Sequence, residues 1–139
     1  MGLMLPRAIY DEAMAHCQQT YPKEACGLLA ADAAGQAVQA YPMTNVEDSP
    51  IGYSMDPKEQ LQVEKRMRHA GQRLAGIYHS HTASEAYPSP VDVRLAISPE
   101  LSYVLVSLKD RAQPQMRSFH LVDGKIIEEE LRVADGGRA

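Results

Sequence analysis

Two histidines, His79 and His81, stand one residue apart at the end of an apolar run, and Asp92 follows after a short polar segment. Residues two apart on a β-strand point to the same side, so both imidazoles would project together while Ser80 faces away. Paired imidazoles are good zinc ligands at about 2.0–2.1 Å per Zn–N bond, and Asp92 could add a carboxylate as third ligand. Three protein ligands leave the fourth position of zinc to water, as in a catalytic site.

A catalytic zinc site also needs a base, and Glu24 is the candidate because it is an acidic residue that opens an otherwise apolar stretch. Zinc lowers the pKa of a bound water toward about 7, and a nearby carboxylate can then take its proton. The same residues also have structural interpretations. The histidines could be partly buried and hydrogen-bonded, Ser89 and Asp92 could form a helix capping box, and Glu24 could be a surface acid after a turn. The residue types alone leave a zinc hydrolase and a structural role open.

The sequence predicts a first helix over residues 6–22, because Pro6 suits a first turn and Pro22 stops a helix. The buried face of this helix is predicted to carry Ile9, Ala13, Met14 and Cys17. An amphipathic pattern of this kind indicates a helix that packs on a sheet or on another helix.

Capping signals predict two further helices. Asp56 would be the N-cap of the second helix, with Pro57 at its first position, Glu59 as the capping-box acid and Gly71 at its end. A short third helix begins within residues 89–98 by the same logic, with a serine as N-cap and a proline at the first position. The two predicted metal-binding segments therefore lie at a strand end and at a helix start.

Apolar and alternating runs predict six strands, with turns near Gly35 and at Asp123-Gly124. The expected strands span residues 24–32, 36–45, 73–81, 102–109, 115–124 and 125–133. This order of elements indicates the α/β (α+β) class, with a mixed, mostly antiparallel sheet flanked by helices. We expect one domain over residues 1–133 and a mobile tail over residues 134–139.

The charge balance of the 139-residue chain narrows the function classes. A formal net charge of -4 argues against nucleic acid or an anionic membrane as a partner, and no apolar stretch is long enough to cross a bilayer. The N-terminus lacks the basic and apolar regions of a secretory signal, and two cysteines do not make a disulfide framework. These features predict a cytoplasmic protein.

A specific motif joins the candidate residues. Glu24 in YPKEACGLL, with His79, His81, Ser89 and Asp92 in YHSHTASEAYPSPVD, matches the motif of the JAMM (MPN+) metallopeptidases. That motif is an upstream Glu followed by His-x-His, seven residues, Ser, two residues and Asp. The chain resembles this family over nearly its whole length, and GYSMDPKE resembles the stretch before the second helix of the short prokaryotic members. The resemblance implies a cytidine-deaminase-like JAB/MPN architecture.

The resemblance also implies a role for each matched residue. His79, His81 and Asp92 would bind one zinc ion per chain. Glu24 would hold the water and pass its proton to the leaving amine. Ser89 would steady the water or the oxyanion of the tetrahedral intermediate, as a donor aimed at developing charge. The capping and catalytic interpretations are compatible, because one helix start would position both Ser89 and Asp92.

Members of this family hydrolyse amide or isopeptide bonds after the C-terminal diglycine of ubiquitin or ubiquitin-like proteins. The short chain resembles members associated with sulfur-carrier proteins in cysteine or related sulfur biosynthesis, so a ubiquitin-like sulfur carrier is the expected substrate. Two alternatives stay open: a non-catalytic MPN scaffold or binding module, and a zinc hydrolase of an unrelated peptide or amide. A homodimer is a further expectation, since small single-domain enzymes often form two-fold dimers.

Other positions carry weaker signals. Thr82 stands where many relatives have Pro after the second His, and Ile77 where many have Trp, so loop shape and substrate fit are expected to differ. Cys26 lies two residues from Glu24 and is either near the metal or a small packed thiol. The remaining histidines lack ligand spacing and are predicted to be surface or structural: His16, His69 and His120.

Overall fold

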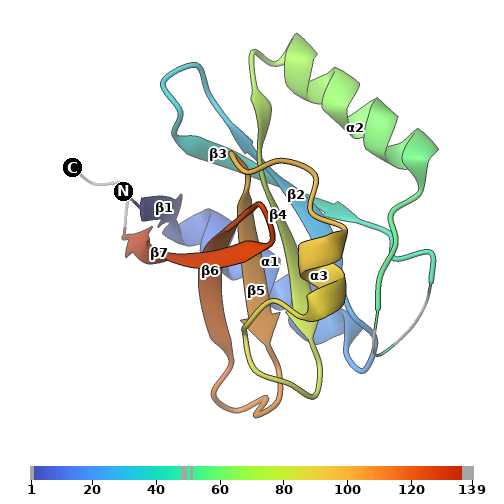
Figure 1. Ribbon diagram of the computed structural model, residues 1–139. Coiled ribbons are helices and arrows are strands. Elements are labelled where there is room, and N and C mark those ends of the chain that lie inside the picture. Colours follow the sequence, from blue (N-terminus) through green and yellow to red (C-terminus); the bar gives the residue numbers. More distant parts are fainter. Residues whose placement is uncertain (1, 48–49, 51, 136–139) are drawn as a thin grey trace.

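The computed structural model describes residues 2–47, 50 and 52–135. Within these residues the centre of the molecule is a seven-stranded sheet in the order β1-β7-β6-β5-β4-β2-β3 (Figure 1). The strands are β1 (Gly2–Pro6), β2 (Cys26–Ala31), β3 (Ala37–Met43), β4 (Arg73–His81), β5 (Ser102–Ser107), β6 (Gln115–Val122) and β7 (Lys125–Ala134). Only the β1–β7 and β4–β5 pairs are parallel among these neighbours, which confirms the mixed, mostly antiparallel sheet.

The sequence analysis did not predict β1. This strand pairs in parallel with residues 130–134 of β7, at the opposite end of the chain. The five residues of β1, which end in a proline, show no clear alternation of apolar and polar residues. Their pairing with β7 is therefore decided by tertiary contacts. Pro6 is the last residue of the strand and the N-cap of the following helix, with φ -55° and ψ 146°, and therefore precedes the first turn instead of lying in it.

Helix α1 (Arg7–Thr20) follows β1 directly and buries one side against the sheet. Ile9, Ala13 and Cys17 are its buried residues, and their spacing of four places them along one stripe of the helix. Met14 is partly buried against the same core. The predicted buried face of this helix is confirmed.

Helix α2 (Pro57–His69) begins where the capping signals predict. The side chain of Asp56 accepts a hydrogen bond from a backbone N–H of the first turn, and Gly71 follows the helix with φ +72°. The prediction for Glu59 is wrong, because its carboxylate does not reach back to its own helix start. It accepts hydrogen bonds from the backbone N–H and the hydroxyl of Thr44 instead, at 3.1 and 3.3 Å. Thr44 offers the Glu59 carboxylate two donors, whereas a capping box would offer it only the backbone N–H of the N-cap residue.

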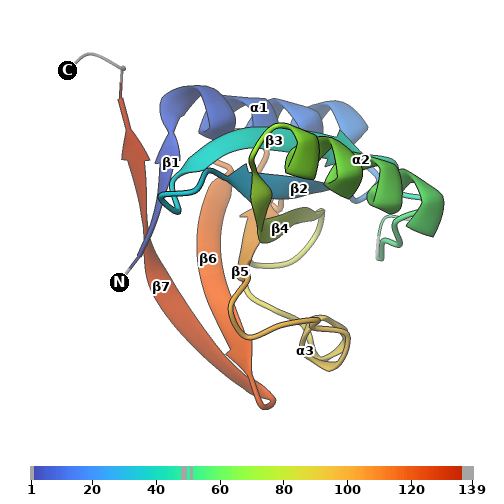
Figure 2. The ribbon, with the colours of Figure 1, turned by 90° about the horizontal axis from the view of Figure 1, so that it is seen from above.

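Apolar cores lie on both faces of the sheet. Helix α1 packs on one face, while α2 and the short α3 (Pro90–Arg94) lie toward the other; Figure 2 shows α1 and α3 on opposite sides. Strand β4 contributes to both cores by alternation: Ile77 belongs to the core on the α2 side and Tyr78 to the core beneath α1. The same alternation directs His79 and His81 toward the α2–α3 side.

Gly27 of β2 allows a close approach between two strands. A Cβ at this position would overlap the ring of Tyr78, its partner in the β2–β4 register. The Tyr78 side chain is fully buried, and its hydroxyl is 2.6 Å from Nδ1 of His16 on α1. The ring is therefore fixed from both sides.

The C-terminal strands follow their predicted turn. Asp123 and Gly124 have φ values of 51° and 77°, as a type I′ turn between β6 and β7 requires. Strand β7 continues to Ala134, and Asp135 accepts a hydrogen bond from Nε of Arg7 at 2.9 Å. Residues 136–139 of that tail lie outside the described residues. No helix in the described part of the chain has the length and apolar character that a membrane span requires.

Candidate active site

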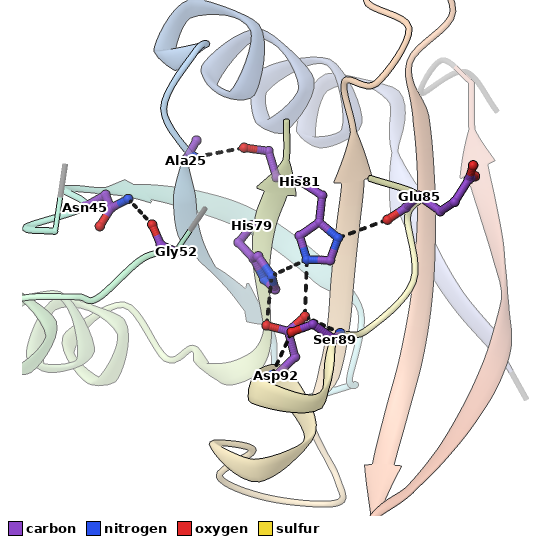
Figure 3. A network of polar contacts seen from close by, with 9 residues as sticks. Ala25, Asn45, Gly52, His79, His81, Glu85, Ser89 and Asp92 are labelled. Carbon is purple, nitrogen blue, oxygen red and sulfur yellow. Dashed lines mark hydrogen bonds and ion pairs between the residues drawn. The ribbon is translucent and has the colours of Figure 1, made fainter. Parts of the chain in front are cut away.

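The three predicted ligand residues converge on one point at the end of β4 (Figure 3). Nε2 of His79 is 3.3 Å from Nε2 of His81 and 3.3 Å from Oδ1 of Asp92. Nε2 of His81 is 3.2 Å from Oδ2 of the same carboxylate. Both histidines are buried, and their Nε2 atoms face the carboxylate of Asp92.

The spacing of these atoms fits a tetrahedral metal ion. Ligands at about 2.0–2.1 Å from a tetrahedral zinc lie about 3.3 Å from one another, by simple geometry. The observed separations of 3.2–3.3 Å, in which each histidine faces a different oxygen of the Asp92 carboxylate, lie close to this value. Two imidazole nitrogens and a carboxylate are also a donor set that zinc accepts. The residues present therefore fit a zinc-type ion with one coordination position left over.

The orientation of His81 is set by the chain that follows it. Nδ1 of His81 is 2.9 Å from the carbonyl oxygen of Glu85. A carbonyl oxygen can only accept, so Nδ1 carries a proton, and Nε2 is the nitrogen that faces the shared point. His79 is held differently, since the ring of Tyr53 packs on it with centroids 4.5 Å apart. Burial lowers the pKa of His79, which favours the neutral imidazole that a metal requires.

Asp92 reaches the site from the first turn of α3. The predicted capping box is confirmed: Ser89 Oγ accepts from the N–H of Asp92 at 3.1 Å, and Asp92 Oδ2 accepts from the N–H of Ser89 at 2.8 Å. Burial by itself would raise the pKa of Asp92. Hydrogen bonds with His79 and His81 outweigh that effect and hold the pKa well below its usual range. The carboxylate is thus ionised and fixed in direction.

Glu24 lies two residues before β2 and is 6% exposed, so it is not the surface acid that one interpretation of the sequence allowed. Burial raises the pKa of Glu24 to about 7. The negative charges of Asp92 and Glu47 add to this increase, and His81 opposes it. A carboxyl group with a pKa near neutrality can both accept and release a proton under ordinary conditions.

A cavity of about 790 Å³ contains all five predicted site residues: Glu24, His79, His81, Ser89 and Asp92. Apolar side chains from α3 and the following segment form part of its wall, among them Leu95 and Ile97. These two side chains are 67% and 66% exposed, so the cavity opens to solvent beside an apolar rim. The predicted residues are therefore accessible to a substrate from outside.

A family model described as prokaryotic homologs of the JAB domain matches residues 6–122. The chain belongs to this family. The JAB domain is 42% identical over 134 residues to the CysO-cysteine peptidase of Mycobacterium tuberculosis, which covers 96% of this chain and 92% of that protein. It is also 38% identical over 95 residues to a probable TtuB-protein conjugate cleaving protease of Thermus thermophilus, with 68% of this chain and 63% of that protein covered.

Two solved structures share the fold, and one of them is a JAB1/MPN domain protein from Archaeoglobus fulgidus, with a TM-score of 0.59, 17% identity and coverage of 96% of this chain and 99% of the other. The JAB domain superposes on a protein from Desulfitobacterium hafniense with a TM-score of 0.87 and 39% identity, covering 96% of this chain and 94% of the other. The predicted JAB/MPN architecture is thus confirmed, and the curated relatives are named as a peptidase and a protease.

The weaker signals of the sequence resolve into structural roles. Cys26 is fully buried in the core on the α2 side, with Sγ 3.9 Å from the carbonyl oxygen of Thr44, and burial raises the pKa of its thiol to about 12. It is a packed thiol. His16 contacts Tyr78 from α1, while His120 lies 3.0 Å from a carboxylate oxygen of Glu129 on β7.

The two departures from the family pattern have visible consequences. Thr82 donates a hydrogen bond from its hydroxyl to the carbonyl oxygen of Pro50 at 2.8 Å, which a proline in its place could not do. Ile77 is 5% exposed and fills the core below the site. Sequence reasoning missed two contributors to the site, Tyr53 and Asn45. The only signal was their place in or near the stretch that precedes α2.

Proposed function

We propose that this JAB domain is a zinc-dependent peptidase that hydrolyses the amide bond after the C-terminal diglycine of a ubiquitin-like sulfur carrier. The observation that carries the proposal is the convergence of His79, His81 and Asp92 at mutual distances of 3.2–3.3 Å in a cavity that also holds the buried carboxyl group of Glu24. A scaffold has no need for a buried acid with a pKa near 7 beside a complete ligand set.

Zinc, when bound, supplies a water of lowered pKa and an electrophile for the carbonyl oxygen of the substrate. Glu24 accepts a proton from the attacking water and donates it to the nitrogen of the leaving group. Ser89 Oγ accepts from the N–H of Asp92 and still has its own hydroxyl hydrogen to offer to the oxygen that becomes negative. The five side chains thus divide the work: Glu24 transfers the proton, Ser89 stabilises the charge, and the two histidines and the aspartate bind the metal.

The substrate class is supported by the relatives and by the shape of a diglycine tail. One relative is named as a peptidase for CysO-cysteine and another as a protease for TtuB-protein conjugates. Two glycines let a chain terminus approach a buried carbonyl-binding position without side-chain clashes. The leaving group is an amino acid such as cysteine, which places the reaction in cysteine or related sulfur biosynthesis, or a lysine amine of a conjugated protein.

A substrate panel tests the proposal. The zinc-loaded protein is incubated with a ubiquitin-like sulfur carrier extended past its diglycine by one cysteine, with the same carrier in which dialanine replaces diglycine, and with an unrelated peptide. Intact mass reports the products. We expect loss of the added cysteine from the diglycine carrier alone, and no loss after chelation.

Each other outcome of the panel contradicts a different part of the proposal. Equal cleavage of the dialanine carrier would refute the diglycine requirement. Cleavage of the unrelated peptide alone would indicate another class of amide hydrolase. Full zinc occupancy without cleavage of any substrate would favour a binding module.

A further inference from the structure

One peptide group, between Glu24 and Ala25, is held at both ends by side chains. Its carbonyl oxygen accepts a hydrogen bond from Nδ2 of Asn45 at 2.9 Å. Its N–H donates to Oγ of Ser80 at 2.8 Å. Strand β2 begins only at Cys26, so two side chains here replace the partners that a strand ladder would provide.

Ser80 is the middle residue of the His-x-His segment and is fully buried on the side of β4 away from the metal-binding point. Besides accepting through Oγ, it donates its backbone N–H to the carbonyl oxygen of Ala25 at 3.0 Å. Because side chains alternate along a strand, the side chains of three successive residues of β4 point to opposite faces of the sheet. His79 and His81 point to the site, and Ser80 fixes the peptide that follows Glu24.

Asn45 approaches the same peptide from the other side and uses all the hydrogen-bonding positions of its amide. Nδ2 donates to the carbonyl oxygens of Glu24 and Gly52, at 2.9 and 3.0 Å. Oδ1 accepts from the N–H groups of Glu47 and Ser54, both at 3.0 Å. An amide with four partners has a single favourable orientation, so its bond to Glu24 is fixed in direction.

We propose that Asn45 and Ser80 are positioning residues for Glu24, which set the plane of its C-terminal peptide and thereby the direction in which its side chain leaves the backbone. The inference rests on the proposed function, in which Glu24 is the base. A general base must lie within hydrogen-bond reach of its proton, at about 2.6–3.2 Å. A rotation of this peptide plane shifts the Glu24 carboxylate at the far end of a long side chain, and a misplacement of about 1 Å can cost about 100-fold in rate.

Two variants break the two contacts that hold this peptide. Ser80→Ala deletes the acceptor for the N–H of Ala25. Asn45→Asp keeps the acceptor for Glu47 and Ser54 but deletes the donor to Glu24 and, with it, the donor to Gly52. We expect kcat on the diglycine carrier to fall about 10- to 100-fold in each, with KM and zinc content unchanged.

A second readout is independent of activity, because loss of one hydrogen bond should make amide exchange at Ala25 about fivefold to tenfold faster in Ser80→Ala. Ser118→Ala is the matched control, because Ser118 is also fully buried on a strand, where its Oγ bonds to Glu129 at 2.6 Å. This control should keep the wild-type kcat and the wild-type exchange rate of Ala25.

The outcomes separate this inference from the proposed function. Wild-type kcat in both variants, with faster exchange at Ala25, would overturn the positioning role and leave the peptidase standing. A kcat loss of the same size in Ser118→Ala would also overturn it. Absence of turnover by the zinc-loaded wild type would refute the proposed function and this inference with it. If Ser80→Ala does not fold, the kcat of Asn45→Asp alone tests the positioning role. Aspartate has the same shape as asparagine, so this variant keeps the packing of the side chain.

Discussion

Replacing Glu24 by glutamine should make the metal-free protein less sensitive to alkaline pH. The carboxyl group is 6% exposed, and burial raises its pKa from 4.5 to about 7. In the unfolded chain the group ionises near its ordinary pKa, whereas in the folded chain ionisation is disfavoured. The free energy of unfolding therefore decreases as pH rises from 4.5 through 7. A neutral glutamine of similar size does not cause this decrease.

The magnitude follows from the two pKa values. With about 7 in the folded and 4.5 in the unfolded protein, Glu24 costs about 1 kcal/mol of stability at pH 5 and about 3 kcal/mol at pH 8. Relative to wild type, the Glu24→Gln variant should therefore gain about 2 kcal/mol between pH 5 and pH 8. Effects of the substitution that do not depend on pH cancel in this difference.

The assay is urea denaturation of both proteins at pH 5 and pH 8 with a chelator present, which removes the contribution of metal. Glu100→Gln is the control, since it replaces an exposed carboxylate in another part of the surface and should leave the pH dependence unchanged. Identical pH dependence in wild type and Glu24→Gln would refute the claim that this carboxyl group is buried and has a raised pKa. A gain in the control of the same size would refute it as well.

Two further predictions concern metal binding and packing. Zinc at about 100 times its dissociation constant should stabilise the wild type by about 2.7 kcal/mol, measured as a shift of the denaturation midpoint, and Asp92→Asn should lose most of this gain. Asp56→Asn is the matched control, because it alters an aspartate at the start of another helix outside the site, and an equal loss there would contradict the ligand assignment. Gly27→Ala should destabilise the protein by about 1–3 kcal/mol, because the new Cβ overlaps the buried ring of Tyr78. Wild-type stability in that variant would mean that the ring can move.

The parts of the site that could be predicted from the sequence are those with local signals. The alternation of β4 places His79 and His81 on one face whatever the rest of the sheet does. The Ser-Pro-x-Asp segment contains its own helix start, so Ser89 and Asp92 had to lie together on one turn. Spacing alone could not bring these two segments to the same point. That required the family motif or the tertiary structure.

The parts that could not be predicted depend on contacts between distant residues. Strand β1 is specified by its pairing with β7 at the other end of the chain. Glu59 carried a capping signal but lies within reach of two donors on Thr44, and these replaced the local partner. Asn45 has the composition of an ordinary loop residue, and only the folded chain brings its amide to the carbonyl oxygen of Glu24. In each case a non-local hydrogen bond decides the outcome.

The central claim is that a base at Glu24 acts beside a metal held by three other residues. Its most direct test compares wild type and Glu24→Gln at equal zinc content, with cleavage of the cysteine-extended carrier followed by intact mass. We expect one zinc per chain in both proteins and a rate at least about 100-fold lower in the variant. Turnover at the wild-type rate by zinc-loaded Glu24→Gln would contradict the account.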